Sequence, residues 1–371
     1  MKQFGVGCLH FSISDKLKNN ITVEDYANEI VESLEKLTTI SNVIMSFNSE
    51  DKDAEISIAD TTKMRDGEPC FPLLYGFNLS FNIYIPKRVQ ASSINESEDY
   101  IDTGTEKFKV NFIHSWHGPL TYIECVDAGN NTSPSSAVRV VREYLIKEFS
   151  SLDTYIYLDC IGPSPFHANF SLCDNEEPLE SENAFILEHA KLRGYDQLSF
   201  KYHNPKVESE DEALEYLFDS LSDELSFYYF LQINRSSEIH DWSNIQELMH
   251  SLLEFEDDSI KKTIKDKLIK KPKLFKKAFK EVGLFKGEVM YSKSIMEQQF
   301  RDIYTSGKHT VYLKPVLERV INEWQVYPIQ ETIDLLLYFD QKNSKSLELS
   351  IVFTAAVVGG GIGGAISVLF S

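Results

Sequence analysis

The chain has 371 residues, and its 42% hydrophobic and 12% aromatic content indicates a packed globular body rather than disorder. Its net charge is −20, and an acidic surface repels a phosphate backbone, which disfavours direct binding of nucleic acid. The five cysteines are widely spaced and form no Cys-x-x-Cys pair. This usage favours reduced thiols in the cytosol over a disulfide framework.

Residues 1–204 are predicted to form an α+β domain. The clearest strand is 77–85, because its apolar side chains alternate with polar ones. A helix is expected over 23–37 after a cap at Thr22 or Asn20, and another from 134 to about 149. The other expected strands are 2–11, 42–47, 54–59, 107–115, 120–126, 155–160, 166–172 and 195–203. A strand-helix-strand-strand order near 4–59 recurs near 120–172, so the domain is either a duplicated unit or a single sheet with a coincidental order.

Residues 205–340 are predicted to form an all-α helical domain. The first helix, 208–233, has an acidic face and an aromatic face, and Asp241 is expected to cap a separate second helix. Further helices are expected over 260–269, 273–282, 294–305, 311–324 and 330–339, with Gly283 as a C-terminal cap.

Residues 349–371 contain no charged residue and follow a polar linker over 341–348. A helix of this length reaches about 33 Å, the thickness of the hydrocarbon core of a bilayer. The sequence therefore predicts one C-terminal transmembrane helix. No signal peptide is apparent at the N-terminus, and Lys342 and Lys345 lie just before the apolar stretch, so we expect the body to be cytoplasmic. A buried apolar helix and a flexible glycine segment are the alternatives.

The apolar stretch carries two ladders of small residues at a spacing of four. They are Ala355, Gly359, Gly363 and Ser367, and Ala356, Gly360 and Gly364. Such ladders let helix backbones approach closely in lipid, which offsets the poor helix propensity of glycine. The pattern predicts a homo-oligomer, with a monomeric anchor as the alternative.

A basic segment runs from Lys261 to Lys293, with twelve lysines and three acidic residues. Its net charge is +9, so the rest of the chain carries −29. Contact with lipid headgroups or another anionic partner is expected for Lys261, Lys262, Lys265, Lys273, Lys276, Lys277 and Lys280. The alternative interpretations of this segment are a solvent-exposed face of a helical bundle and a nucleic-acid contact.

No catalytic motif, metal site or cofactor-binding motif is predicted. Arg235 and His240 fit a loose Arg-x4-His pattern of one superfamily of helical ribonucleases, a spacing that arises easily by accident. We therefore expect a membrane protein whose N-terminal domain binds a protein partner or small ligand. This division of labour resembles the general plan of bacterial membrane effectors in antiviral or stress defence. A membrane-anchored scaffold and a ribonuclease in the helical domain are the alternatives.

Overall fold

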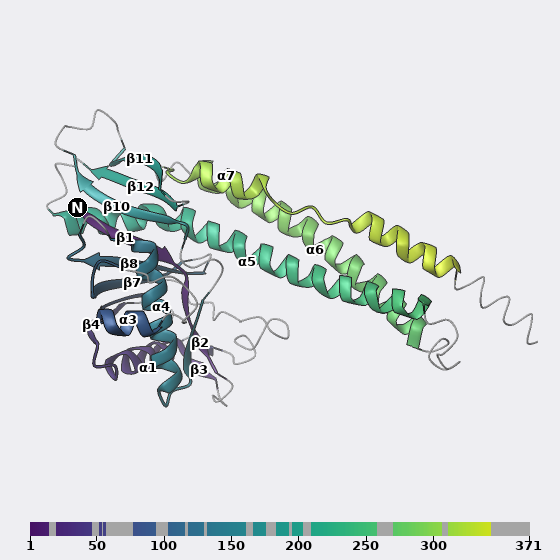
Figure 1. Cartoon of the computed structure of the whole chain (residues 1–371), viewed down its shortest axis with the longest axis horizontal. Helices are drawn as coiled ribbons and strands as arrows, with labels where there is room; N and C mark the ends of the chain where they lie inside the picture. The colour runs from purple at the N-terminus through teal and green to yellow at the C-terminus, as the bar shows by residue number, and fades with distance from the viewer. Residues whose placement is uncertain are drawn as a thin grey trace, which may run out of the picture. The chain divides into compact units, whose positions relative to one another are not determined.

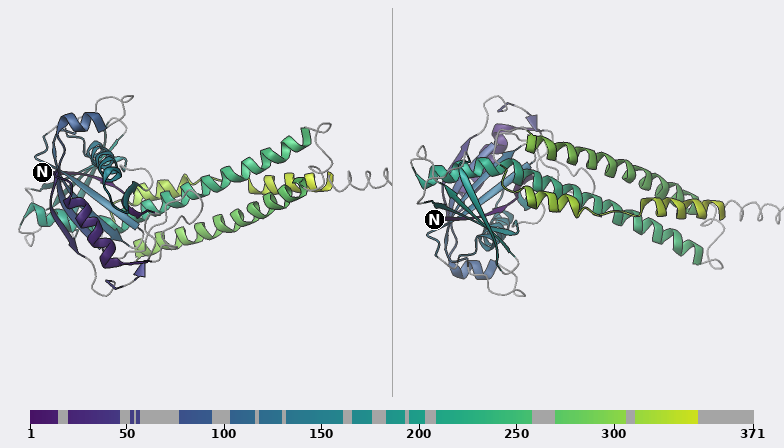
Figure 2. Two further views of the ribbon diagram at one scale, coloured as in Figure 1. Left: turned by 90° about the horizontal axis from the view of Figure 1, so that it is seen from below. Right: turned by 90° about the horizontal axis from the view of Figure 1, so that it is seen from above.

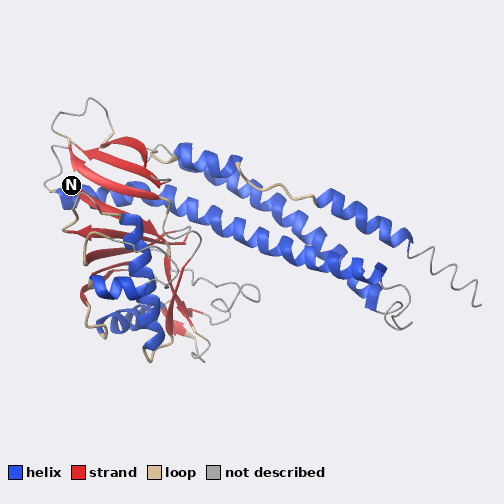
Figure 3. Ribbon diagram, in the orientation of Figure 1, coloured by secondary structure: helices blue, strands red, loops and turns tan. Residues whose placement is uncertain are grey.

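The chain has an α+β fold with one large mixed sheet, shown by the strands and helices in Figure 3. The computed structural model describes residues 1–14, 20–46, 52–53, 55–56, 77–93, 103–115, 118–129, 132–160, 166–175, 183–192, 195–202, 209–257, 270–305 and 311–342. The strands are β1 (Lys2–Gly7), β2 (Leu9–Ile13), β3 (Ile21–Thr22), β4 (Ile40–Ser46), β5 (Glu55–Ile56), β6 (Phe77–Tyr84), β7 (Lys107–Ser115), β8 (Gly118–Val126), β9 (Ile156–Cys160), β10 (Ala168–Asp174), β11 (Phe185–Leu192) and β12 (Tyr195–Tyr202). The helices are α1 (Val23–Glu35), α3 (Lys87–Ser93), α4 (Pro134–Ser151), α5 (Glu210–Asp257), α6 (Lys271–Thr305), α7 (Lys314–Asn322) and a last helix over 329–342.

The chain divides into two compact units. The first unit comprises Met1–Asn234 and Gln298–Glu323, and the second comprises Arg235–Glu297 and Trp324–Ser371. Because the division falls within α5 and α6, each of these helices contributes residues to both units. The boundary expected near residue 204 and the duplication of the N-terminal domain stay predictions.

The sheet of the first unit has eight strands in the order β11-β12-β10-β1-β8-β7-β6-β4. Among the described strands of this sheet, only β10 and β12 pair in parallel, and the other neighbours are antiparallel. Helices α1 and α4 pack on one face over a core that includes Leu79, Val110 and Ile123, as Figure 1 shows. The first part of α5 packs on the opposite face against Phe4 and Tyr122.

Local sequence explains why these elements begin where they do. Thr22 and Asp25 form a capping box at the start of α1: the Thr22 Oγ1 accepts from the Asp25 amide at 3.0 Å, and the Asp25 Oδ2 accepts from the Thr22 amide at 3.3 Å. Pro134 occupies the first turn of α4. The alternating strand β6 buries its apolar side chains as predicted, and the strands expected over 107–115 and 120–126 form the antiparallel pair of β7 and β8.

Several expected boundaries are wrong. The strand expected over 2–11 is interrupted at Cys8, after which β2 pairs with β9 outside the large sheet. Strand β11 and helix α3 were not predicted, because neither segment has a clear apolar period. No new helix starts at Asp241, since α5 is continuous from Glu210 to Asp257. Gly283 is not a cap: α6 continues beyond it for more than five turns.

The second unit buries its own apolar cluster, with residues from α5, α6 and the last helix. Trp242, Phe285 and Tyr327 pack together, with ring centroids 5.0–5.4 Å apart. Leu336 and Phe339 of the last helix belong to the same cluster. Among the described helices, none is both long and apolar enough to cross a membrane. The predicted transmembrane stretch, 349–371, lies outside the described residues.

Gly5 is required where β1 passes under α4. A Cβ atom at this position would lie 2.3 Å from the carbonyl oxygen of Pro134 and 2.6 Å from a methyl group of Val138. We expect Gly5→Ala to destabilise the first unit by about 2 kcal/mol, because backbone must move to relieve the overlap. Thermal melting of the purified chain measures this. Gly129→Ala is the matched control, since no atom lies within 4 Å of its added Cβ; equal melting temperatures for the two variants would contradict the prediction.

Candidate binding groove

The second face of the large sheet has an apolar half and a polar half. On β1 and β8 this face carries Phe4 and Tyr122, whereas on β6 and β7 it carries mainly polar side chains together with the apolar Ile113. The pairs are Asn78 with Ile113, Ser80 with Asn111 and Asn82 with Lys109. The alternation of apolar and polar residues in the strands therefore places a hydrogen-bonding surface beside an apolar one.

Helix α5 covers the apolar half. Phe218 stacks on Tyr122 with ring centroids 4.0 Å apart and meets Phe4 edge-on at 5.0 Å. The Tyr122 hydroxyl donates to the Phe218 carbonyl oxygen at 2.9 Å, and burial raises the pKa of Tyr122 far above its usual range. At the start of α5, Lys2 joins the helix to the sheet, because its ammonium lies 2.6 Å from Glu124 and 2.9 Å from Asp211.

A groove of about 610 Å³ lies between α5 and the polar half of the sheet. The sheet lines it with side chains of β4, β6 and β7: Ile44, Ser46, Asn78, Ser80, Asn111 and Ile113. Helix α5 lines it with Glu215, Phe218, Asp219, Ser222 and Asp223. Glu215, Asp219 and Asp223 recur every four residues and are exposed, so one edge of the groove carries three carboxylates.

The hydrogen-bonding capacity of the groove comes from short side chains. Asn78 and Asn111 each offer donors and an acceptor, and Ser80 offers a hydroxyl group. Ser222 already donates to the Phe218 carbonyl oxygen at 2.6 Å. The combination suits a ligand that has a cationic group for α5 and polar groups for the strands.

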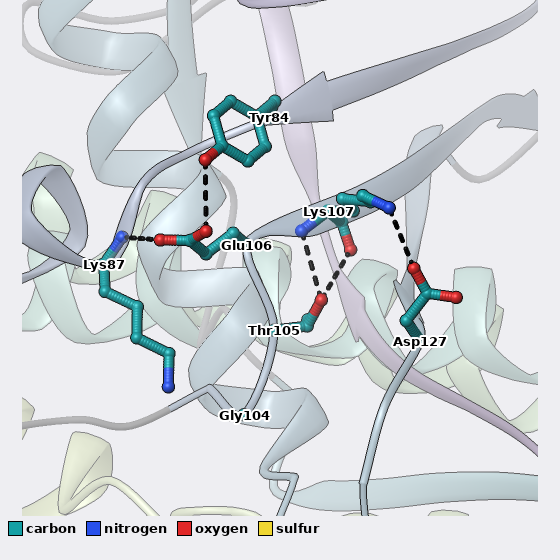
Figure 4. Close-up of a pocket in the computed structure, with 7 residues that line it drawn as sticks. All are labelled: Tyr84, Lys87, Gly104, Thr105, Glu106, Lys107 and Asp127. Carbon is teal, nitrogen blue, oxygen red and sulfur yellow. Dashed lines mark hydrogen bonds and ion pairs between the residues drawn. The ribbon is translucent and has the colours of Figure 1, made fainter.

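A smaller pocket of about 320 Å³ lies at the other end of β6 and β7, and Figure 4 shows its residues. One ion pair and several hydrogen bonds join its residues to one another. Glu106 accepts from the Tyr84 hydroxyl at 3.1 Å and from the Lys87 amide at 2.6 Å, and Lys107 pairs with Asp127 at 3.0 Å. The hydrogen bond to Glu106 raises the pKa of Tyr84. We interpret this pocket as a structural feature in which hydrogen bonds connect the ends of β6 and β7 to neighbouring segments.

The other residues singled out in the sequence do not line the groove in the part of the chain that the structure describes. Arg235 and His240 both lie on α5, where five residues of helix place them about 140° apart. Lys273, Lys276, Lys277 and Lys280 are exposed on α6. Lys261, Lys262 and Lys265 lie outside the described residues, as do all the small residues of the apolar stretch: Ala355, Ala356, Gly359, Gly360, Gly363, Gly364 and Ser367.

Sequence reasoning identified the acidic face of α5 and the polar face of β6, but not that they form one groove. Within the part of the chain that the structure describes, no group of His, Cys, Asp or Glu is arranged to hold a metal ion. In comparisons with known proteins, no family model, curated protein or solved structure matches the chain.

Proposed function

We propose that the chain is a membrane-anchored binding protein whose first unit holds a cationic ligand in the groove between α5 and the sheet. The observation that carries the proposal is the position of Glu215, Asp219 and Asp223 along one edge of this groove, opposite Asn78 and Asn111. Carboxylates at the edge attract a cation, and amide groups opposite them supply the hydrogen bonds that orient it.

The membrane part of the proposal rests on residues 349–371. Their lack of charge supports a transmembrane helix, and the ladder through Gly359 and Gly363 supports self-association in the bilayer. Ligand binding by the cytoplasmic body would then control what the associated helices do to the membrane, as in an effector of a defence or stress system. A scaffold that only anchors a partner is the alternative, and no catalytic activity is proposed.

Neutralising the groove is expected to weaken the binding of cations. The probes are spermidine and tetralysine, titrated calorimetrically into the full chain in detergent. The triple variant Glu215→Gln, Asp219→Asn, Asp223→Asn should lower the affinity by roughly tenfold, because three exposed charges each contribute a fraction of a kcal/mol. Binding to the unsubstituted chain should weaken in high salt.

The matched control neutralises three exposed carboxylates on the opposite side of the sheet, Glu24, Glu32 and Glu35 of α1. This variant changes the net charge by the same amount as the groove variant. Because it leaves the groove intact, it should bind the probes as the unsubstituted chain does. Equal losses in both triple variants would show that binding follows net charge, and the groove assignment would then be wrong.

A further inference from the structure

Helix α6 presents a lysine-rich face away from the core of the second unit. Its inward residues, Ala278 and Val282, are buried in the apolar cluster. Lys273, Lys276 and Lys280 are exposed and lie more than about 120° around the helix from Ala278. These three lysines of the run therefore share one face of the helix, whereas Lys271, Lys286 and Lys293 lie within about 80° of Ala278.

Large apolar side chains interrupt this basic face instead of packing inside the unit. Leu284 is 49% exposed, Met290 66% and Tyr291 70%. At 100° per residue they also lie about 120–140° from Ala278. Gly283 and Gly287 share the face, and no atom lies within 4 Å of a Cβ added to either, so the helix backbone is open there. A purely solvated face has no need of these apolar side chains.

The fold brings the basic end of α6 close to the point where the chain leaves the last helix. Leu274 and Phe275 pack on the cluster that contains Leu336 and Phe339. Figures 1 and 2 show the first turns of α6 at the same end of this unit as the end of helix 329–342. Only six residues separate Lys342 from Leu349, and such a segment spans at most about 25 Å. Lys273, Lys276 and Lys280 thus lie at the same end of this unit as Lys342, the last residue that the structure describes.

We infer that the outer face of α6 lies on the surface of an anionic bilayer, with its lysines at the headgroups and Leu284, Met290 and Tyr291 among the upper acyl chains. The inference rests on the proposed membrane anchor and adds a second, interfacial contact that the anchor alone does not require. Lysine side chains with apolar neighbours on one helical face are the pattern of an interfacial helix. An anionic membrane supplies both the charge that complements the lysines and the apolar layer that receives the other side chains.

The test places an environment-sensitive NBD fluorophore at Tyr291→Cys in the full chain, reconstituted into vesicles of phosphatidylcholine alone or with phosphatidylglycerol. Emission should shift to the blue and intensify only with phosphatidylglycerol. The same label at Gln246→Cys, an exposed position on α5, should report water in both vesicles. The unsubstituted chain is the blank for labelling of the native cysteines.

Charge reversal gives the matched comparison. A triple variant should abolish the whole phosphatidylglycerol-dependent change in NBD emission: Lys273→Glu, Lys276→Glu, Lys280→Glu. Reversal of three exposed lysines of the first unit, Lys36, Lys147 and Lys191, should leave this change intact. An aqueous signal at residue 291 in every vesicle overturns the inference. A blue shift that follows the protein-to-lipid ratio overturns it in favour of contact with a second copy.

Carbonate washing distinguishes failure of the proposed α6 contact from failure of the proposed transmembrane anchor. A chain that resists carbonate but shows an aqueous residue 291 has the anchor and lacks the α6 contact. A chain that carbonate removes, but that floats with phosphatidylglycerol vesicles in low salt through Lys273, Lys276 and Lys280, has the α6 contact and lacks the anchor.

Discussion

A chain that ends at Glu348 is expected to stay in the soluble fraction after lysis, whereas the full chain sediments with membranes and resists carbonate. The removed segment is uncharged, and the transfer of its apolar side chains into lipid would provide the insertion free energy. The proposed contact of α6 with headgroups is electrostatic, so it should not survive carbonate or 1 M salt. Fractionation of the two chains, detected by immunoblotting, measures the difference. Carbonate-resistant sedimentation of the shortened chain would contradict a transmembrane role for residues 349–371.

A test of self-association needs substitutions that leave the proposed helix in the bilayer. Gly359→Leu with Gly363→Leu fills the ladder and should abolish cross-linked oligomers while membrane retention is unchanged. Val357→Leu with Val368→Leu adds one methylene group at each of two positions about 160–180° around a helix from Gly359 and should leave cross-linking intact. If both pairs behave alike, the small residues have no packing role, and the scaffold alternative is favoured.

The elements of the first unit were largely predictable because its strands alternate and its helices are capped. Phe77–Tyr84 and the Thr22 capping box each carry a local signal that the tertiary structure keeps. Strand β11 was not predicted because Glu188, Ala190 and Lys191 favour a helix in isolation. Its pairing with β12 at the edge of the sheet overrides that preference.

The lengths of α5 and α6 were mispredicted for the same reason, because packing overrode local signals that suggest a helix break. Asn234, Ser236 and Ser237 suggest a break, yet α5 continues through them because Trp242 and Ile245 extend the buried face into the second unit. Asn234 also donates to the Phe230 carbonyl oxygen at 3.0 Å, which satisfies its amide without ending the helix.

The groove could not be predicted from sequence because it depends on sheet order. Glu215 and Asn111 are about 100 residues apart, and each shows only that its own element has a polar face. They meet because β1 joins the sheet between β8 and β10, which places Phe4 beside Tyr122 and gives Phe218 an apolar surface to cover. Such long-range pairings leave no local pattern in the sequence.

Replacement of Glu224 is expected to cause a large loss of stability in the first unit. This side chain is only 2% exposed, and its two oxygens accept from the amides of Tyr312 and Leu313, both at 2.8 Å, just before α7. Glu224→Ala removes both of these hydrogen bonds, which should cost about 3 kcal/mol, because hydrogen bonds to charged groups contribute about 1.5–3 kcal/mol each. Thermal melting at pH 7 measures the loss, with Glu247→Ala, an exposed site on the same helix, as the control.

The same carboxylate should make stability depend on pH. Burial raises the pKa of Glu224 to about 7, although the two amide donors oppose the shift, and nearby Asp223 adds to it. The folded state therefore binds a proton more tightly than the unfolded state, in which the pKa is about 4.5. The stabilisation is complete below pH 4.5 and is lost as the pH rises through 7, with a limit of about 3 kcal/mol.

Glu224→Gln isolates this contribution because its amide is neutral at every pH. Between pH 5 and pH 8 the free energy of unfolding of the unsubstituted chain should fall more steeply than that of the variant. Glu238, whose pKa is also raised by burial, contributes to both slopes and cancels in the difference. Identical slopes would mean that Glu224 is already ionised at pH 5, with its pKa held down by the α7 amides more strongly than burial raises it.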